Sequence, residues 1–211
     1  MILKSRTSLN WLSLSGLLAG GFYILHLVFG MAEYPGYNWL RQAVSDLTAI
    51  DAPSYLVASR FAAIYASLAC LCSVVLCVIV REQANRRLRL GLYAYALMQW
   101  VSNIGYTLFP LSGSGFSGSF QDVMHFYVVT LAVVLLSILS LVLIIIGGWK
   151  LPAYRVLGMF AGLCLFMMIL GSIGMGIVPP AYFGLFERFS VLSVVFFTTV
   201  LGIFGFVHDS H

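Results

Sequence analysis

Residues 122–148 read DVMHFYVVTLAVVLLSILSLVLIIIGG, and this stretch decides the fold class. A helix needs about 20 consecutive, mostly apolar residues to cross the hydrocarbon core of a bilayer. The stretch meets that requirement, with Asp122 and His125 confined to its head. We therefore predict a membrane-spanning helix over residues 122–148.

The rest of the chain repeats this pattern between short polar joints. We predict five further membrane helices at about 10–32, 56–80, 90–111, 154–178 and 186–207. The composition agrees, because 61% of the 211 residues are hydrophobic and 9% are charged, whereas a soluble domain carries roughly 25% charged residues. We predict an all-α fold, a six-helix transmembrane bundle that forms a single integral membrane domain over residues 1–211.

The loop after the first membrane helix has a helical pattern of its own. Residues 38–48 place an apolar set on one face, namely Trp39, Leu40, Ala43, Val44 and Leu47. Asn38 is a favourable residue to cap the start of a helix. We predict a short amphipathic surface helix in this first external loop, with Arg41, Ser45 and Asp46 turned toward water or toward a pocket.

The basic residues predict the orientation, because Lys and Arg gather on the cytoplasmic side of membrane proteins. One side of the six-helix arrangement holds eight of the 11 Lys and Arg residues: Lys4, Arg6, Arg81, Arg86, Arg87, Arg89, Lys150 and Arg155. We predict a multi-pass cell-membrane protein with both termini cytoplasmic. The positive charges follow topology, so we expect membrane lipids as partners, with a partner membrane subunit or a homo-oligomer left open, and no nucleic acid.

Ionisable residues at membrane depth are functional-site hypotheses by default, because they are costly to insert. They gather in the external third of the predicted bilayer, and the cytoplasmic halves read as nearly pure hydrocarbon. The candidate catalytic residues are Ser45, Asp46, Asp122 and His125. The candidate binding residues are His26, Glu33, Arg60, Asn103, Glu187 and Arg188. We expect them to converge on one external polar pocket, in which arginines pair with carboxylates.

Structural explanations compete with these functional ones. Asp122 and His125 are three residues apart, so Asp122 could orient the imidazole across one helical turn, but an acid at this place also complements the helix dipole. Arg60 could extend to the headgroups. Glu187 and Arg188 could be rim residues at the start of a helix. A buried histidine such as His26 is more often bonded between helices than it is a ligand.

The whole chain resembles a bacterial and archaeal membrane family catalogued as domain of unknown function 998. The resemblance rests on the six-helix layout and on three motifs: Tyr34-Pro-Gly-Tyr-Asn-Trp-Leu-Arg-Gln-Ala-Val-Ser-Asp-Leu, Asp122 with His125, and Gly184-Leu-Phe-Glu-Arg. It implies no established activity. Membrane hydrolases of the alkaline-ceramidase and adiponectin-receptor type are a more distant likeness, because Ser45, Asp46, Asp122, His26 and His125 imitate their zinc-site residues. A third intramembrane histidine is missing, since His208 and His211 fall on the other side.

Three functions remain open at this point. The first is a membrane protein that binds a lipid headgroup, a small solute or a partner protein in the polar pocket. The second is a membrane-embedded hydrolase or transferase acting on lipid, with or without a metal, in which His125 or His26 serves as general base. The third is a haem or quinone protein that uses His26 and His125 as axial ligands. No motif specifies a cofactor or a metal.

Overall fold

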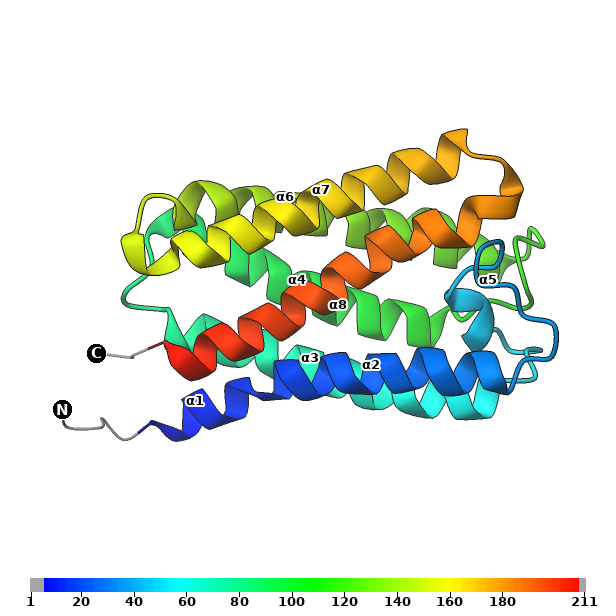
Figure 1. The fold of residues 1–211 in the computed structure, drawn as a ribbon, viewed down its shortest axis with the longest axis horizontal. Coiled ribbons are helices and arrows are strands. Elements are labelled where there is room, and N and C mark those ends of the chain that lie inside the picture. The colour runs from blue at the N-terminus through cyan, green and yellow to red at the C-terminus, as the bar shows by residue number, and fades with distance from the viewer. Residues whose placement is uncertain (1–5, 209–211) are drawn as a thin grey trace.

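The computed structural model describes residues 6–208, and within that range it contains helices and connecting loops and no strand (Figure 1). The α-helices are α1 (Ser8–Ser13), α2 (Ser15–Ala32), α3 (Tyr55–Ile79), α4 (Arg86–Leu108), α5 (Phe120–Val123), α6 (Leu131–Gly148), α7 (Arg155–Ile177) and α8 (Phe183–Val207). The short 3-10 helices are η1 (Ser45–Thr48), η3 (Pro152–Tyr154) and η4 (Pro180–Tyr182), and η2 (Met124–Thr130) is a π-helix that joins α5 to α6.

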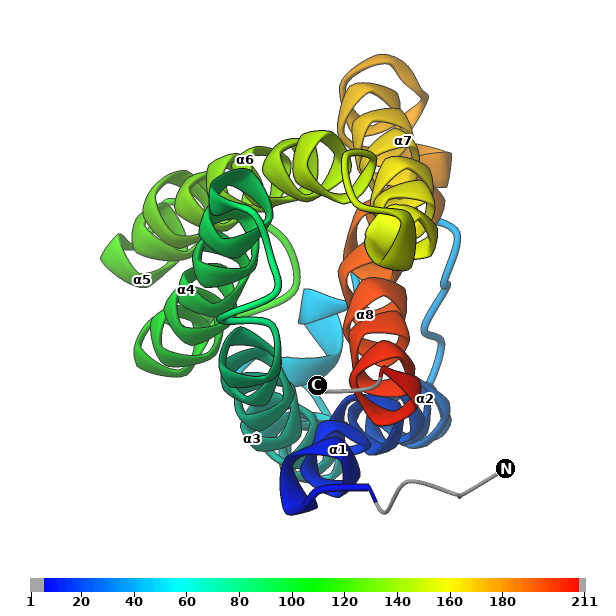
Figure 2. The same cartoon turned by 90° about the vertical axis from the view of Figure 1, so that its left-hand side faces the viewer.

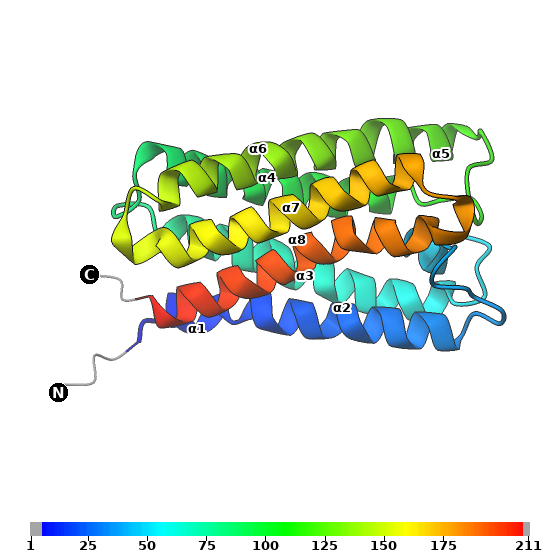
Figure 3. The same ribbon diagram turned by 45° about the horizontal axis from the view of Figure 1, so that its top comes forward.

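The long helices form a closed ring. Going round it, α2 packs on α3, α3 on α4, α4 on α6, α6 on α7, α7 on α8, and α8 returns to α2 (Figures 2 and 3). Arg6 and His208 lie at the same end, which we call the terminal end (Figure 1). The opposite end, which we call the loop end, holds the connections 33–54, 109–119 and 178–179.

The predicted six-helix bundle is confirmed. Five helical stretches are long and apolar enough to cross a membrane: Ser8–Ala32, Tyr55–Ile79, Phe120–Gly148, Pro152–Ile177 and Pro180–Val207. The sixth long helix, α4, is more polar because it begins with Arg86, Arg87 and Arg89 and also carries Gln99 and Asn103. Gln99 is turned inward and is only 1% exposed, so this part of the polarity of α4 lies in the interior of the bundle.

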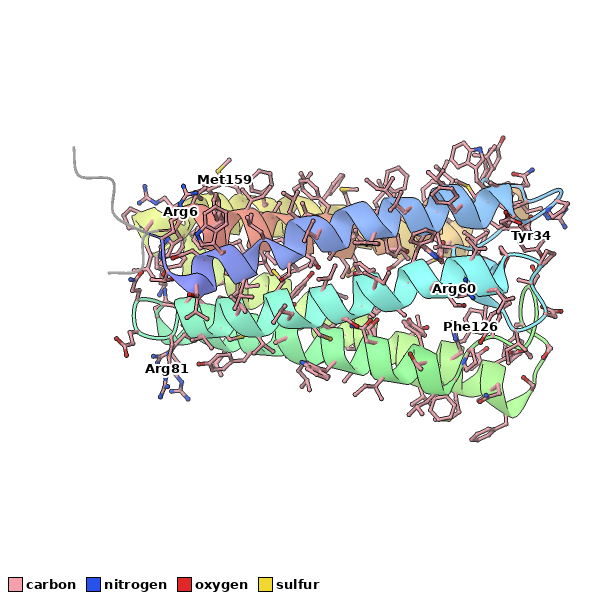
Figure 4. The ribbon with its side chains drawn as sticks, turned by 90° about the horizontal axis from the view of Figure 1, so that it is seen from below. Arg6, Tyr34, Arg60, Arg81, Phe126 and Met159 are labelled. Carbon is pink, nitrogen blue, oxygen red and sulfur yellow. The ribbon has the colours of Figure 1, made fainter. Side chains whose placement is uncertain are left out.

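The outside of the bundle is suited to lipid. Side chains project from the bundle along its whole length in the view of Figure 4, and Ile24, Leu56 and Phe166 are each more than half exposed. Soluble monomeric proteins rarely expose a contiguous apolar surface of this extent. Together with the apolar helices, it identifies the chain as a multi-pass membrane protein.

The predicted surface helix over residues 38–48 is wrong in extent and in place. Asn38 O accepts bonds from the amides of Arg41 and Gln42, which makes a single turn, and regular structure resumes only in the four residues of η1. The expected direction of its apolar side chains is confirmed for Val44 and Leu47, which are 4% and 0% exposed, whereas Trp39 is 49% exposed. Figure 2 shows the light-blue η1 inside the ring of helices and the stretch before it along the outside of α8.

Helix α8 explains why residues 38–48 do not form a continuous helix. In such a helix the carbonyl oxygen of Leu40 would accept from the amide of Val44. Here Leu40 O accepts from the amide of Leu185, at 3.0 Å, and the Val44 amide donates to the Glu187 carboxylate at 2.9 Å. Competition from α8 therefore replaces the helical hydrogen bonds, and the first loop becomes a plug. We use that name, the plug, for residues 37–52.

Candidate binding site

Arg188 clamps the plug to the head of α8. It is 8% exposed, and its Nη1 donates to Trp39 O at 2.6 Å, to Gln42 O at 3.0 Å and to Gly184 O at 2.8 Å, while Nη2 donates to the Tyr37 hydroxyl at 2.7 Å. Its hydrogen-bond acceptors among residues 6–208 are three carbonyl oxygens and a phenol, so the predicted ion pair with a carboxylate is wrong. Backbone carbonyls of the plug supply the acceptors that a carboxylate would have supplied.

Tyr37 completes this clamp from the loop side. Its hydroxyl accepts from Arg188 and donates to Ala43 O at 2.6 Å. Burial raises the pKa of Tyr37 to about 12, although the neighbouring guanidinium opposes the rise. The hydroxyl therefore stays protonated and keeps its donor role. This role could not be predicted from the sequence, because a tyrosine in a Pro-Gly turn is an ordinary loop residue.

Glu187 is half-buried near the head of α8. It accepts from the Val44 amide at 2.9 Å, and Val44 packs in one apolar cluster with Tyr23. The charges of Asp46 and Arg188 act on Glu187. Glu187 therefore joins the plug to a group of side chains below it.

Asp46 connects the two large loops of the loop end. Its Oδ2 accepts from the Ala43 amide at 3.2 Å and its Oδ1 accepts from the Gly115 amide at 3.3 Å. Gly115 has a φ of +83°, a conformation that favours glycine. Burial raises the pKa of Asp46, and hydrogen bonds from Gly115, Ser114 and Ala43 oppose the rise. Asp46 is thus an anchoring group between loops.

Asp122 is fully enclosed at the start of α5, where its partners are serines. Oδ1 accepts from the Ser112 amide at 3.1 Å and from its hydroxyl at 2.8 Å, and Oδ2 accepts from the Ser117 amide at 2.8 Å and from its hydroxyl. These bonds occupy both oxygens. Asp122 makes no hydrogen bond to His125, so the expectation that it orients the imidazole is wrong.

His125 lies in the π-helical turn η2 and is 7% exposed. Its Nδ1 is 2.8 Å from Phe109 O, at the last turn of α4, and its ring lies 4.6 Å from that of Tyr106. The wide turn is closed by Thr130, whose hydroxyl donates to His125 O at 2.8 Å. Single π-helical turns are frequent at functional sites.

His26, on α2, repeats the arrangement of His125. It is 3% exposed, and its Nδ1 is 3.0 Å from Ala58 O of α3. Its ring lies 5.3 Å from that of Tyr23, which in turn lies 4.8 Å from that of Tyr65. Both histidines are therefore buried, each bonded to a carbonyl and each beside a tyrosine.

We use one name, the polar layer, for six polar residues that lie below the plug and contribute to the proposal that follows: Tyr23, His26, Tyr65, Tyr106, His125 and Glu187. They come from α2, α3, α4, η2 and α8. Within residues 6–208 the fully enclosed side-chain nitrogen and oxygen atoms without a hydrogen bond are Ser15 Oγ and Ser137 Oγ. The Nε2 atoms of His26 and His125 also make no hydrogen bond within that range. Because they are not among these fully enclosed atoms, each Nε2 atom keeps some exposed surface.

Seven of the ten predicted site residues lie outside the polar layer: Asp46, Asp122 and Arg188, described above, and Glu33, Arg60, Asn103 and Ser45. Glu33 and Arg60 are exposed, and Figure 4 shows Arg60 near the loop end of α3. Asn103 ties α4 to α3, because its Nδ2 donates to Ala66 O at 3.2 Å and lies 3.0 Å from Cys70 Sγ. Ser45 begins η1, and its carbonyl accepts from Thr48. The sequence pattern could not separate these roles, because depth alone does not show which way a side chain points.

A deeper polar network was missed by the sequence analysis. Gln99 Nε2 donates to Thr198 Oγ1 at 2.8 Å, and the Tyr95 hydroxyl lies 2.8 Å from the same oxygen. Asn10 and Ser13 are buried still nearer the terminal end and donate to carbonyls of α8. The expectation that this half of the bundle is nearly pure hydrocarbon is therefore wrong. The network consists of uncharged groups, which a search for ionisable residues passes over.

The metal-site hypothesis gains no ligand set from the described residues. Within residues 6–208 no group of three or more His, Cys, Asp or Glu side chains is placed to hold a metal ion. His208 lies at the terminal end, where its Nε2 is 2.8 Å from Gln83 Oε1. His211, which also entered the zinc-site comparison, lies outside the described residues.

The comparisons with known proteins give one match. A family model described as "Protein of unknown function (DUF998)" matches residues 17–203. No curated protein and no solved structure matches the chain. The comparisons do not show the more distant likeness to membrane hydrolases. The matched range begins in α2 and ends in α8, so it includes the plug and the polar layer.

Proposed function

We propose that this chain, which belongs to the DUF998 family because the family model covers most of its length, binds a small polar ligand in the polar layer. The ligand would be a lipid headgroup or a small solute that reaches the membrane protein from the loop end. The observation that carries this proposal concerns His26 and His125, which are both buried. In each ring Nδ1 is hydrogen-bonded to a backbone carbonyl, and Nε2 has no hydrogen-bond partner among residues 6–208.

The hydrogen bonds fix the tautomer of both rings. A carbonyl oxygen can only accept, so Nδ1 of His26 and Nδ1 of His125 must carry the proton that they share with Ala58 O and Phe109 O. A neutral imidazole protonated at Nδ1 has a lone pair at Nε2. Neither Nε2 atom has a donor among residues 6–208, and each keeps some exposed surface. A ligand with N–H or O–H groups could therefore reach such an acceptor and donate to it.

The orientation is part of the proposal. If the terminal end faces the cytoplasm, the polar layer lies in the outer half of the bilayer, below the plug. A ligand would then come from the external medium or from the outer leaflet.

The test compares ligands that stay with the protein during purification in a mild detergent. Bound small molecules and lipids are extracted and identified by mass spectrometry from the wild type and from a His26→Asn/His125→Asn double variant. Asparagine places an N–H donor near the position of Nδ1 and has no atom at Nε2, so it keeps the carbonyl bond and removes the acceptor. Arg60→Gln, at an exposed position of the same end, is the control.

We expect the double variant to fold, with an unfolding temperature close to that of the wild type, and to lose at least tenfold of the bound ligand. The control should retain it. Equal occupancy in the wild type and the double variant, or an empty wild type, contradicts the proposal. Visible absorption spectra of the same samples test the alternative function. A haem band would contradict the proposal and would support haem binding by His26 and His125.

A further inference from the structure

We infer that the terminal end binds the phosphate headgroup of an anionic phospholipid, at three basic residues that lie where α4 begins and α6 ends. We call Arg86, Arg87 and Lys150 the basic patch. It lies at the other end of the bundle from the plug, so the inference does not depend on the proposed function. Three features carry it: the junction of the two helices, the charge that no acid balances, and the apolar surface next to the patch.

Helices α4 and α6 bring the basic patch together through one carbonyl oxygen. Gly147 O accepts from Asn85 Nδ2 at 2.7 Å and from the Lys150 amide at 3.3 Å. Asn85 is the N-cap of α4 and directly precedes Arg86 and Arg87. A Cβ at Gly147 would lie 2.7 Å from a backbone atom in the first turn of α4. The basic patch therefore stands on a junction where the two helix backbones are in contact.

The charge of the basic patch is not balanced by the protein. Arg86, Arg87 and Lys150 are exposed, and none of them forms a salt bridge with a carboxylate of residues 6–208. Within that range the terminal end holds seven basic residues and a single acid, Glu82. An anion from outside the chain would supply the missing counter-charge.

Membrane topology requires basic residues on the cytoplasmic side, but it does not require this arrangement. A position in a loop is enough, and Arg81 has such a position (Figure 4). Arg86 and Arg87 instead occupy the first turn of α4, which contains no acid. A helix N-terminus is itself positive and disfavours cations there. Arg89 donates through Nη1 to Arg81 O at 3.0 Å, whereas the two arginines before it have no acceptor among residues 6–208.

The surface beside the basic patch is suited to the acyl chains of a lipid. Leu90 follows Arg86 by one helical turn, and Ile146 precedes Lys150 by the same spacing. Both apolar side chains are exposed, and so is Trp149 at the end of α6. Tryptophan is typical of the headgroup level of a bilayer. A free phosphate would use only the cations, whereas a phospholipid would also cover this apolar surface, so the arrangement favours the lipid.

The test measures binding to the full-length protein in a mild detergent by native mass spectrometry. The probes are phosphatidylglycerol, phosphatidylcholine with the same acyl chains, and glycerol 3-phosphate, which has the charge without the chains. We expect phosphatidylglycerol to bind roughly tenfold more tightly than either of the others, or better. Equal affinity for phosphatidylcholine overturns the selection of an anionic headgroup. Equal affinity for glycerol 3-phosphate overturns the assignment to a lipid.

A double variant tests the arginines of the basic patch. Each basic residue near anionic lipid contributes about fivefold to binding, so Arg86→Gln/Arg87→Gln should weaken the binding of phosphatidylglycerol about twentyfold. The matched control is Arg41→Gln/Arg60→Gln, which removes two exposed arginines at the loop end, and its affinity should be unchanged. The substituted side chains are exposed, so we expect both variants to fold with the unfolding temperature of the wild type. Unchanged binding in the first variant, or equal losses in the two, overturns the inference.

Two single variants distinguish a site from general attraction by a basic surface. Lys150→Gln removes one cation of the basic patch and should weaken the binding of phosphatidylglycerol about fivefold. Arg6→Gln removes one cation at the same end but on another helix, because the guanidinium carbon of Arg6 lies 3.7 Å from the centre of the Phe206 ring of α8. Its affinity for the lipid should stay that of the wild type. Equal losses in the two single variants overturn the assignment to the α4–α6 junction.

Discussion

At the scale of single residues, Arg188 does what no other side chain could do in its place. A guanidinium has five N–H donors in a fixed plane, whereas an ammonium is a compact point charge on a flexible stem. Arg188 uses that plane to reach oxygens at both ends of the turn that begins the plug, Tyr37 and Gln42, and one oxygen of its own helix. Its charge is buried and makes no salt bridge with a carboxylate, so these hydrogen-bond acceptors stabilise the buried charge.

Replacing Arg188 should therefore loosen the plug. Hydrogen bonds to a charged donor contribute ~1.5–3 kcal/mol each, so we expect Arg188→Ala to lower the free energy of unfolding by ~3 kcal/mol or more. Arg188→Lys should recover less than half of the loss. Thermal unfolding in detergent, followed by limited proteolysis of residues 37–52, measures both effects. Arg60→Ala is the control, and a loss of stability in that variant equal to the loss in Arg188→Ala would contradict the prediction.

Asp46 gives the molecule a predictable response to pH. Burial raises the pKa of Asp46 above its ordinary value of 3.8, so the folded state holds this proton more tightly than the unfolded state does. The stabilising contribution of the proton is complete below about pH 4 and is lost as pH rises through the raised pKa. The unfolding temperature of the wild type, relative to Asp46→Asn, should therefore fall from pH 4 upward. A difference that grows with pH has the wrong sign for this account.

At the scale of elements, two of the motifs singled out in the sequence are partners. The loop motif that begins at Tyr34 and the motif Gly184-Leu-Phe-Glu-Arg meet where the plug lies on α8. Leu185 N bonds to Leu40 O, Glu187 accepts from Val44, and Arg188 reaches Trp39 O, which is 149 residues away in the sequence. The motifs are thus two halves of one interface.

This interface shows where prediction from sequence succeeds and where it stops. Each membrane helix has a local signal, because about 20 apolar residues suffice to indicate a span, and the six-helix fold could be predicted from such runs. The plug has no such local signal. Its apolar positions fit a helix, but the groups that decide its backbone come from α8.

The candidate site follows the same rule. The burial of His26 could be predicted, because an ionisable group facing lipid is costly. The hydrogen bonding of Asp122 and His125 could not be predicted, because a spacing of three residues shows only that the two side chains could touch. Ser112 and Ser117 offered Asp122 four donors from a nearby loop, and the carbonyl of Phe109 was available to His125.

Gly184 is the element-scale test of this interface. A Cβ at Gly184 would lie 2.8 Å from Trp39 O and nearer still to Gln42 O, both backbone atoms of the plug. Crowding of this kind typically costs ~1–3 kcal/mol, so Gly184→Ala should lower the unfolding temperature. Gly162→Ala is the matched control, since nothing lies within 4 Å of that position. Alanine is favoured over glycine inside a helix by ~0.5–1 kcal/mol, and the control should be neutral or stabilised.

At the scale of the whole molecule, the two ends of the bundle differ in charge. Among residues 6–208 the terminal end holds one acid, Glu82, and seven basic residues: Arg6, Arg81, Arg86, Arg87, Arg89, Lys150 and Arg155. Figure 4 shows Arg6 and Arg81 at this end and Tyr34 at the other. Lys4 and Asp209 lie outside the described residues. The loop end combines five acids, Glu33, Asp46, Asp51, Asp122 and Glu187, with Arg41, Arg60 and Arg188.

This difference predicts the topology, because loops rich in Lys and Arg stay in the cytoplasm. Single cysteines at Glu82 and at Ser114, both exposed and at opposite ends, can report the side they face. The native cysteines are poor competitors for the reagent, since Cys70, Cys72 and Cys164 are buried and Cys77 is partly so. In intact cells a membrane-impermeant maleimide should label Ser114→Cys at once and Glu82→Cys only after lysis. The reverse labelling pattern would place the polar layer in the cytoplasmic leaflet. A ligand would then have to come from inside the cell, and the proposed external route would be wrong. Labelling of both sites before lysis would contradict a membrane crossing by α4, because α4 alone joins the loop 81–85 to the loop 109–119 and a crossing places them on opposite sides.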